Sequence, residues 1–430
     1  MQAEERVHDV LLANADYQIN FNDGKSSLVA YLAGQKTKRE HYTGIRPDSN
    51  SNEEAEYLLN LPYGASLNTT KQVGVQVNHK YDKFIGINVL TVGSEYTSDD
   101  VMDEILAYNY LVDQKIKTTG VFLQSDWNLT ENINLLSGVR LDKHSLLEDV
   151  VLSPRVSFLY KLQRNSQFRV SYSTGFRAPQ AFDADLHIAF AGGGVSRIML
   201  LEGLKEERSK SLSSSYNYDR AAERYIFGVT IEGFYTILDD AFYLDPAGED
   251  EYGDVFVKRN GDGATVKGVT MEFRANFNRK VQIESGLTIQ KSLYHDKVSY
   301  SDDLESRYEF LRTPNKYGYA TINYNLSDRY NFAANLVHTG KMDLVHMGGA
   351  PEQSEDEYFT SEVFNAIALK ATYIQKFKRV GVNLEYSIGV KNLANAYQNN
   401  FDSLKDRDSN FVYGPAVPRA IYFSLVLKTI

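Results

Sequence analysis

The side chains that do covalent chemistry or bind metals are few and scattered in this sequence. His338 and His346 lie eight residues apart with no third ligand nearby, and a zinc site needs at least three protein ligands. Seven acidic residues gather between Asp239 and Asp254, but they lack the alternating Asp-x-Asp-x-Asp-Gly register of a calcium loop. These patterns favour solvated or structural side chains, and we expect no metal site.

The sequence also lacks the motifs that mark enzymatic nucleophiles and cofactor-binding loops. The chain has no cysteine, and no Gly-x-Ser-x-Gly segment marks a serine nucleophile. The Gly192–Gly194 run lacks the Lys-Ser/Thr that a phosphate-binding loop requires, which indicates a flexible loop. The net charge of −10 disfavours nucleic acid as a partner. The sequence therefore predicts neither an enzyme nor a cofactor.

The elements that must position any site are β-strands. Val269, Met271 and Phe273 alternate with polar neighbours, and this period of two recurs along most of the 430 residues. The pattern predicts about seventeen strands. They are expected at 15–22, 26–38, 70–80, 83–96, 116–128, 132–143, 153–162, 167–174, 206–219, 223–239, 264–278, 281–293, 315–326, 329–339, 367–377, 381–391 and 419–428.

The connections between these strands alternate in length without exception. Short turns of one to three residues, such as 278–280, alternate with long connections at 39–69, 97–114, 144–152, 175–205, 240–263, 294–314, 340–366 and 392–418. An all-β, antiparallel up-and-down transmembrane β-barrel has this pattern, with tight turns facing the periplasm and long loops outside. Apolar residues then meet lipid, and Glu272, Arg274 or Lys391 point into a wet lumen. A soluble propeller is the alternative, but no repeat of about 40–50 residues is present.

The strand that ends in "SYSTGFRAP" is the first segment with a family resemblance. Gly175 permits a bend and Pro179 cannot donate to a sheet, so the strand stops at its outer end. "LSPRVSFLYKL" followed by "FRVSYSTGFRAPQAFDADLHI" is similar to the barrel of TonB-dependent outer-membrane receptors. "GVRLDKHS", "NGDGATVKGVTMEF", "FLRTPNKYGYATINY" and the closing "IGVKNLANAYQNNFDSLKDRDSNFVYGPAVPRAIYFSLVL" also resemble segments of this family, the last one its Bacteroidota branch.

The resemblance implies more than this chain contains. Members carry an N-terminal plug domain and a TonB-contacting segment, and a plugged transporter barrel has 22 strands. We therefore expect residues 1–430 to be one partial barrel domain, without the plug and the first strands. Its first strand is expected to have an unpaired edge or to pair imperfectly with 419–428. Barrels of this kind also end in an aromatic residue, whereas this sequence ends Lys428-Thr429-Ile430.

The resemblance implies a function in the outer membrane of Gram-negative cells. The expected function is TonB-energised uptake of a large scarce ligand, namely a ferric siderophore, haem, a corrinoid such as cobalamin, or a glycan. The expected partners are that ligand, the TonB system through the missing plug, and outer-membrane lipid and lipopolysaccharide. A passive porin-like channel and an outer-membrane enzyme remain alternatives.

Ligand capture is expected in the long loops, where Tyr residues accumulate among the 30 of the chain. Any one of these aromatic residues belongs either to the girdle at the lipid boundary or to the ligand site. The predicted contacts lie in the loops 175–205, 240–263 and 392–418. They are Arg177, Phe182, Tyr243, Arg407 and Tyr413.

Overall fold

The computed structural model describes residues 2–82, 85–180, 197–201, 203–251, 253–350, 353–403, 408, 411–415 and 417–429. It is almost entirely β-sheet. The one α-helix among these residues is the short α1 (Asn52–Leu59), and η1 (Leu106–Tyr108) is a single 3-10 turn. None of the helical segments described is long and apolar enough to cross a membrane.

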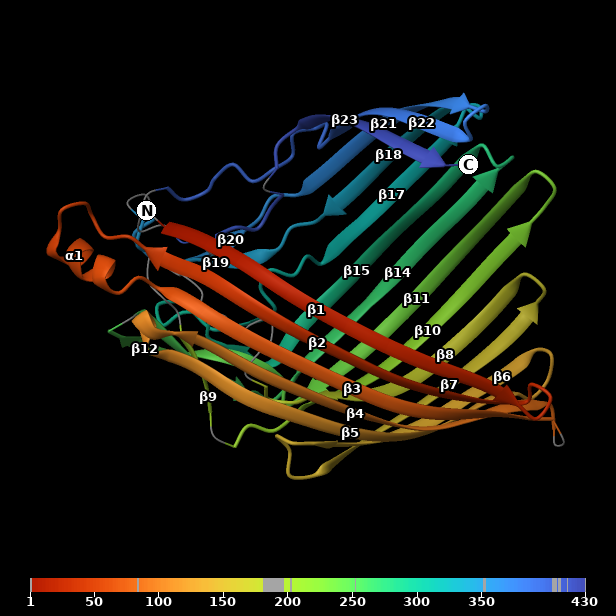
Figure 1. Cartoon of the computed structure of the whole chain (residues 1–430), viewed down its shortest axis with the longest axis horizontal. Coiled ribbons are helices and arrows are strands. Elements are labelled where there is room, and N and C mark those ends of the chain that lie inside the picture. Colours follow the sequence, from red (N-terminus) through yellow and green to blue (C-terminus); the bar gives the residue numbers. More distant parts are fainter. Residues whose placement is uncertain are drawn as a thin grey trace.

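One antiparallel sheet forms a curved wall (Figure 1). Within the described residues it contains seventeen long strands and the three-residue β16 (Arg307–Glu309). The first five are β1 (Gln2–Phe21), β2 (Ser26–Ile45), β3 (Tyr63–Tyr81), β4 (Ile87–Ile105) and β5 (Tyr110–Asn128). The middle ones are β6 (Ile133–His144), β7 (Val150–Gln163), β8 (Ser166–Arg177), β10 (Glu207–Ala221), β11 (Tyr225–Asp239), β14 (Ala264–Phe277) and β15 (Val281–Val298). The last are β17 (Lys316–Asn325), β18 (Tyr330–Thr339), β21 (Phe364–Phe377), β22 (Val382–Lys391) and β23 (Ala420–Thr429).

These seventeen strands correspond one to one to those predicted from alternation, so the up-and-down architecture is confirmed. Each long strand pairs with the next long strand along the chain. Among the described residues β1 pairs only with β2, and β23 pairs only with β22. The wall therefore has two edges, and the expected unpaired edge on the first strand is present.

Strand ends differ from the prediction at the side of the long connections. The predicted connections 97–114 and 144–152 are wrong as long loops, because β4 continues to Ile105, β5 begins at Tyr110 and β7 begins at Val150. The strand predicted at 15–22 likewise begins at Gln2. Alternation fails as a signal there because apolar residues follow one another directly, as in Leu11-Leu12 and Val101-Met102, while the backbone ladder needs no particular side-chain pattern.

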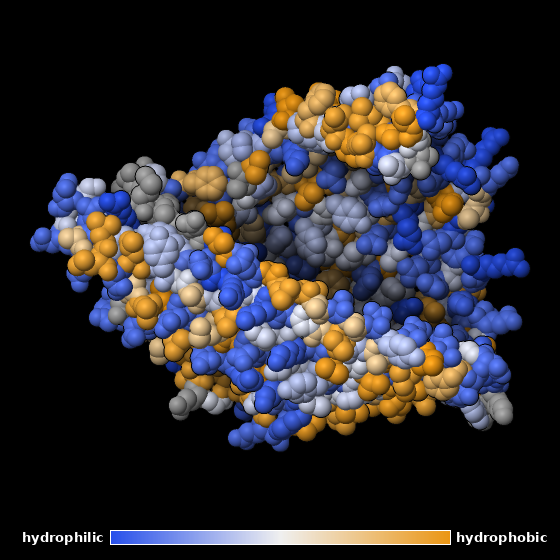
Figure 2. All heavy atoms as spheres, viewed as in Figure 1, coloured by the Kyte–Doolittle hydropathy of each residue, from blue (hydrophilic) through white to orange (hydrophobic). Residues whose placement is uncertain are grey.

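The register assigns every wall residue to one of two faces. Val229 lies opposite Phe273, which lies opposite Ser285, and this row continues the apolar face, here called the lipid face. The intervening residues make polar contacts on the other side, here called the lumen face: Arg274 donates to Asp219 at 2.7 Å and to Thr230 at 3.1 Å. Figure 2 shows the hollow between the two parts of the wall. The predicted facing is thus confirmed.

Aromatic rings lie flat across glycines on the lumen face. In each case the glycine is the residue directly opposite on the neighbouring strand, and a Cβ there would meet the ring at 2.3–2.7 Å. The five pairs are Tyr31 with Gly74, Phe122 with Gly93, Phe234 with Gly268, Tyr319 with Gly286, and Tyr422 with Gly389. A glycine lets the ring cover the backbone and fixes the pairing register.

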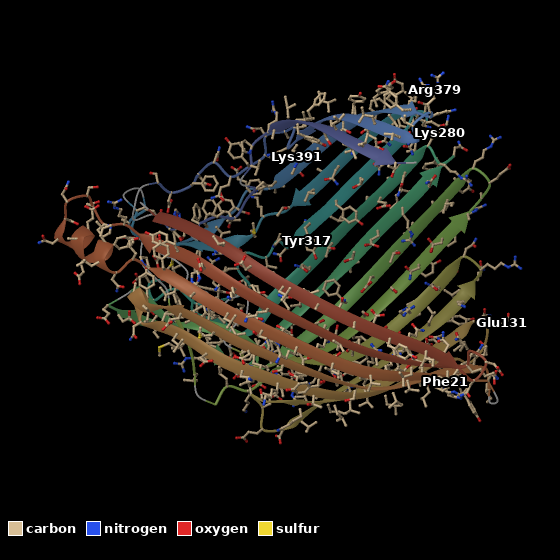
Figure 3. The ribbon with its side chains drawn as sticks, viewed as in Figure 1. Phe21, Glu131, Lys280, Tyr317, Arg379 and Lys391 are labelled. Carbon is tan, nitrogen blue, oxygen red and sulfur yellow. The ribbon has the colours of Figure 1, made fainter. Side chains whose placement is uncertain are left out.

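The short turns gather at one end of the wall, where Figure 3 labels Phe21, Glu131, Lys280 and Arg379. Aromatic pairs on the lipid face lie close to these turns. Tyr330 and Tyr373 have ring centroids 5.2 Å apart, and Tyr373 and Tyr386 are 6.2 Å apart. Such a girdle is typical of a membrane–water interface, so it marks the periplasmic boundary of the apolar band.

The opposite end carries the long loops and two small sheets. The first sheet joins β9 (Arg197–Leu200), β12 (Phe242–Asp250) and β13 (Gly253–Asn260). The second pairs β19 (Asp343–His346) with β20 (Glu357–Thr360). Helix α1 lies at this same end (Figure 1). The loops of the outer mouth are therefore partly ordered by their own hydrogen-bonded strands.

Candidate functional site at the outer mouth

Two of the predicted loops meet around Phe242, in a group here called the β12 cluster: Arg177, Glu207, Phe242 and Lys258. Glu207, opposite Arg177 in the sheet, accepts a hydrogen bond from the Phe242 amide at 3.0 Å. The Arg177 guanidinium lies 5.1 Å and the Lys258 ammonium 4.4 Å from the centre of the Phe242 ring. Two cations thus contact one buried ring, and these cation–π interactions fix the positions of Arg177 and Lys258 relative to Phe242.

Tyr243 follows Phe242 in β12 and lies opposite Arg259. Arg259 pairs with Asp245 at 2.8 Å, so one carboxylate of the acidic loop is already neutralised. Burial raises the pKa of the Tyr243 hydroxyl, which keeps it a hydrogen-bond donor across the physiological range. The predicted contacts Arg177 and Tyr243 therefore belong to one region, with Phe242 as the residue that the sequence did not single out.

Tyr413 belongs to a second group, here called the β19 cluster: Met342, Leu344, Phe359, Phe411 and Tyr413. Met342, Leu344 and Phe411 are buried, and the Tyr413 ring lies 5.2 Å from that of Phe411 and 5.3 Å from that of Phe359. The Tyr413 hydroxyl donates to Asn400 at 2.7 Å, and burial raises its pKa. Phe359 and Tyr413 are only partly buried, and exposed edges of such rings suit a large amphipathic ligand.

Gln398 fixes the backbone around Tyr413. Its side chain is 1% exposed and makes three hydrogen bonds. Its Nε2 donates to the Phe411 carbonyl at 2.8 Å, and its Oε1 accepts from the amides of Tyr413 and Gly414 at 2.8 and 3.2 Å. The described part of the loop 392–418 is thus positioned by a buried side chain and not by a strand ladder.

Arg312 joins three loops at the same place. Its amide donates to the Asp343 carbonyl at 2.7 Å, and its guanidinium donates to the Val412 carbonyl at 3.0 Å. Burial lowers the pKa of Arg312, while Asp408 opposes that effect. The contacts connect the loops 294–314, 340–366 and 392–418 into one cap over this side of the mouth.

The neighbours of His346 indicate a structural role for this side chain. Its Nε2 lies 2.9 Å from both carboxylate oxygens of Asp402, its Nδ1 lies 3.8 Å from Glu357, and its ring stacks on Phe411 at 3.6 Å. A catalytic triad needs a hydroxyl nucleophile on one imidazole nitrogen, and here both nitrogens face carboxylates. His338 is on the lipid face, bonded to Asn365 at 2.8 Å, so the two histidines do not form one site.

Metal binding finds no support in the described part of the chain, where no group of three or more suitable side chains converges. Phe182, Arg407 and the Gly192–Gly194 run lie outside the described residues. Of the placed residues, Arg177 belongs to the β12 cluster, Tyr243 directly follows Phe242 of that cluster in β12, and Tyr413 belongs to the β19 cluster.

A polar network on the lumen face was missed by sequence reasoning. The Tyr31 hydroxyl donates to Glu95, Arg140 Nη2 lies 3.6 Å from Glu95 Oε1, and Arg140 Nε donates to Asp142 at 2.8 Å. These residues lie on three strands, β2, β4 and β6. The sequence held one signal for this network, Gly120. A Cβ at this position would lie 2.3 Å from Arg140 Nη2, so the glycine leaves room for the guanidinium. The network lies on the lumen face of the wall.

The comparison with protein families decides the classification. The family model described as TonB dependent receptor-like, beta-barrel matches residues 5–419. The chain belongs to this family. Members are receptors and transporters of the Gram-negative outer membrane, so the short turns face the periplasm and the clusters at the mouth face outward. The predicted resemblance, barrel class and location are confirmed. No curated protein matches the sequence.

Solved structures agree with the family in fold. A ferric enterobactin receptor of Pseudomonas aeruginosa, in a mutant form, is 16% identical with a TM-score of 0.71, covering 99% of this chain and 62% of that one. The ferric-catecholate import receptor Fiu of E. coli is 13% identical, with a TM-score of 0.69 and coverages of 99% and 64%. The siderophore receptor PiuA of Acinetobacter baumannii is 13% identical, with a TM-score of 0.68, covering 98% of this chain and 64% of that one. The chain thus spans less than two thirds of these relatives.

Proposed function

We propose that this chain forms the barrel wall and outer mouth of a receptor for TonB-energised uptake of a large, scarce ligand. The β12 cluster carries the proposal, because Arg177 and Phe242 come from two loops that were predicted to bind ligand and are held together here. The family assignment supports energised uptake. In the β19 cluster, Phe359 and Tyr413 are only partly buried and supply a second pair of aromatic contacts on the same mouth.

The ligand proposed first is a ferric siderophore. The similar structures are named as receptors for ferric enterobactin, ferric catecholates and siderophores, which suggests this class without establishing it for the present chain. Aromatic rings and cations suit flat, anionic aromatic groups, since both stack on such groups and pair with them. Haem, a corrinoid and a glycan are the competing ligands for the binding assay.

The wall requires further strands to work in a membrane. The edges of β1 and β23 carry backbone N–H and C=O groups without a partner among the described strands, and lipid offers none. A barrel of 22 strands would need five more than the seventeen of the wall. We propose that polypeptide outside this sequence supplies these strands, together with the plug that fills the lumen and contacts TonB.

Loop deletion tests the ligand site. In the full-length protein, deletion of 185–195 leaves β9 intact and removes part of the loop that follows Arg177. We expect ferric siderophore binding to intact cells to weaken at least tenfold, with normal heat-modifiability of the barrel. Deletion of the short turn 278–280 is the control, which should disturb barrel folding because it joins two wall strands.

Two results would contradict the proposal. Unchanged affinity for all four ligand classes after loop deletion would place binding elsewhere. Uptake that continues at the same rate after the proton gradient is collapsed would identify a passive channel, because TonB-driven transport needs inner-membrane energy. Binding and energisation are therefore judged by separate measurements.

A further inference from the structure

The lipid face carries an unpaired group of lysines above a groove. Lys267 in β14 lies directly opposite Lys291 in β15, and Lys316 in β17 lies opposite Ile289, two residues from Lys291. All three side chains are exposed. Like charges directly opposite on adjacent strands destabilise a sheet, so this arrangement calls for an anion between them.

The counter-ion does not come from the described part of the chain. Lys210, two strands away from Lys267, is paired with Asp239 at 2.6 Å. Lys267, Lys291 and Lys316 form no ion pair with any described carboxylate. The three ammonium groups are therefore available to bind an anion that is not part of the described chain.

The depth of these lysines matches a lipid headgroup. Ten residues separate Lys267 from Phe277 at the periplasmic end of β14. At about 3.3 Å per residue and a tilt of about 40°, that length spans roughly 25 Å, the height of the apolar band of a barrel. Lys267 therefore lies at the outer boundary of this band, where the phosphates of outer-leaflet lipids are found.

A groove of about 420 Å³ opens directly below them on the lipid face. Val269, Ile289 and Lys316 lie side by side on three adjacent strands. The next residues on the same face, toward the periplasm, are Met271, Leu287 and Gly318, with Ile231 beside Met271. Ser285 and Gly318 leave this open groove between larger neighbours such as Phe273 and Leu336. A smooth barrel surface would have offered an acyl chain no such recess.

We propose that this surface binds one phosphate-bearing, multiply acylated lipid of the outer leaflet. Its phosphate lies among Lys267, Lys291 and Lys316, and one acyl chain lies in the groove below. The charge above and the apolar recess below match the two halves of such a lipid at the correct membrane depth. The site is separate from the mouth, so it does not depend on the identity of the transported ligand.

Native mass spectrometry of the full-length protein in detergent tests this site. The probes are bis-phosphorylated lipid A and the same lipid after removal of both phosphates. We expect Lys267→Gln/Lys291→Gln to reduce retention of the phosphorylated lipid about tenfold or more, since each lysine near a charged lipid surface contributes about 1 kcal/mol. The control Lys36→Gln/Lys38→Gln removes the same charge from the lipid face at a similar depth on β2, where the opposite residues of β1 are Leu11 and Asp9 and not lysines, and it should change retention much less.

A second variant tests the groove. Ser285→Phe fills the recess without changing charge, and it should weaken retention of both lipid forms by a similar factor. Heat-modifiability shows whether each variant is folded. Equal retention of phosphorylated and dephosphorylated lipid by the wild type would overturn the proposal, and so would equal losses in the lysine variant and its control.

Discussion

The two ends of the wall reach the outer mouth in different ways. The strands β1–β5 have 19 or 20 residues each, whereas β17, β18, β22 and β23 have 10. About ten residues suffice to cross a membrane, so the first region continues outward as a sheet of its own. The second region stops near the boundary and continues in loops.

The difference shows how each half becomes ordered above the membrane. In the N-terminal region the backbone ladder itself continues, and side chains are free to be polar. In the C-terminal region order depends on a few side chains, namely the buried Gln398 and Phe411 and the hydrogen-bonded Arg312. The projecting strands should therefore tolerate substitution widely, while the β19 cluster should fail at single positions.

The largest expected effect separates the embedded and projecting parts of one strand. Val92 and Met102 lie on the same face of β4, ten residues apart. Val92→Arg should cost about 2–4 kcal/mol because it places a charge in the lipid, whereas Met102→Arg should cost under about 1 kcal/mol. Refolding titrations into bilayers measure both. Equal costs would mean that the outer half of β4 is also embedded.

A smaller effect is expected at the C-terminal cap. Gln398→Ala leaves the Phe411 carbonyl and two amides without their partners, which should destabilise the cap by about 1–3 kcal/mol. Limited proteolysis should then cut within 392–415, with no loss of heat-modifiability of the barrel. Tyr413→Phe, which keeps the ring and removes only the hydroxyl, is the matched control. Global unfolding by Gln398→Ala would show that the cap is part of the barrel's cooperative unit.

The smallest expected effect concerns pH at the N-terminal region. The Asn50 amide donates to Glu54 at 2.6 Å, and this bond, followed by that from Arg46, lowers the pKa of Glu54. A lowered pKa stabilises α1 fully above the unfolded value of about 4.3, and the stabilisation is lost as pH falls through the folded value. Hydrogen exchange in residues 46–62 should accelerate at pH 3 relative to pH 6, after correction for intrinsic rates. Glu54→Gln should remove most of that difference; a persistent difference would assign it to another group.

The sequence predicts the wall better than the mouth, for a physical reason. Inside the membrane one face must be apolar, so residues such as Val269 and Met271 reveal their strand. Beyond it no such rule holds, and in β4 the buried Val101 is followed directly by the exposed Met102, which is why the outer ends of β4 and β5 were expected as loop. The β19 cluster depends on contacts between positions such as His346 and Asp402, far apart in the chain, and no local pattern encodes them.

The candidate contacts show the same limit. Arg177 and Tyr243 were predicted from residue type and loop position; Arg177 contacts Phe242, and Tyr243 is the next residue of β12, opposite Arg259. Phe242, which organises that cluster, had no distinguishing pattern. The lumen network of Tyr31, Glu95 and Arg140 required knowledge of the strand register, which alternation alone does not supply.

The glycines beneath the lumen rings also constrain how this wall can evolve. A methyl group at Gly74 or Gly93 would lie 2.3 Å from the opposing ring, so neither glycine tolerates replacement while that ring stays in place. Loss of the ring removes the constraint. In homologues the two members of each pair should therefore change together, with small residues appearing at Tyr31 or Phe122 wherever the glycine is lost. Lineages that widen or narrow the lumen would do so through such coupled exchanges.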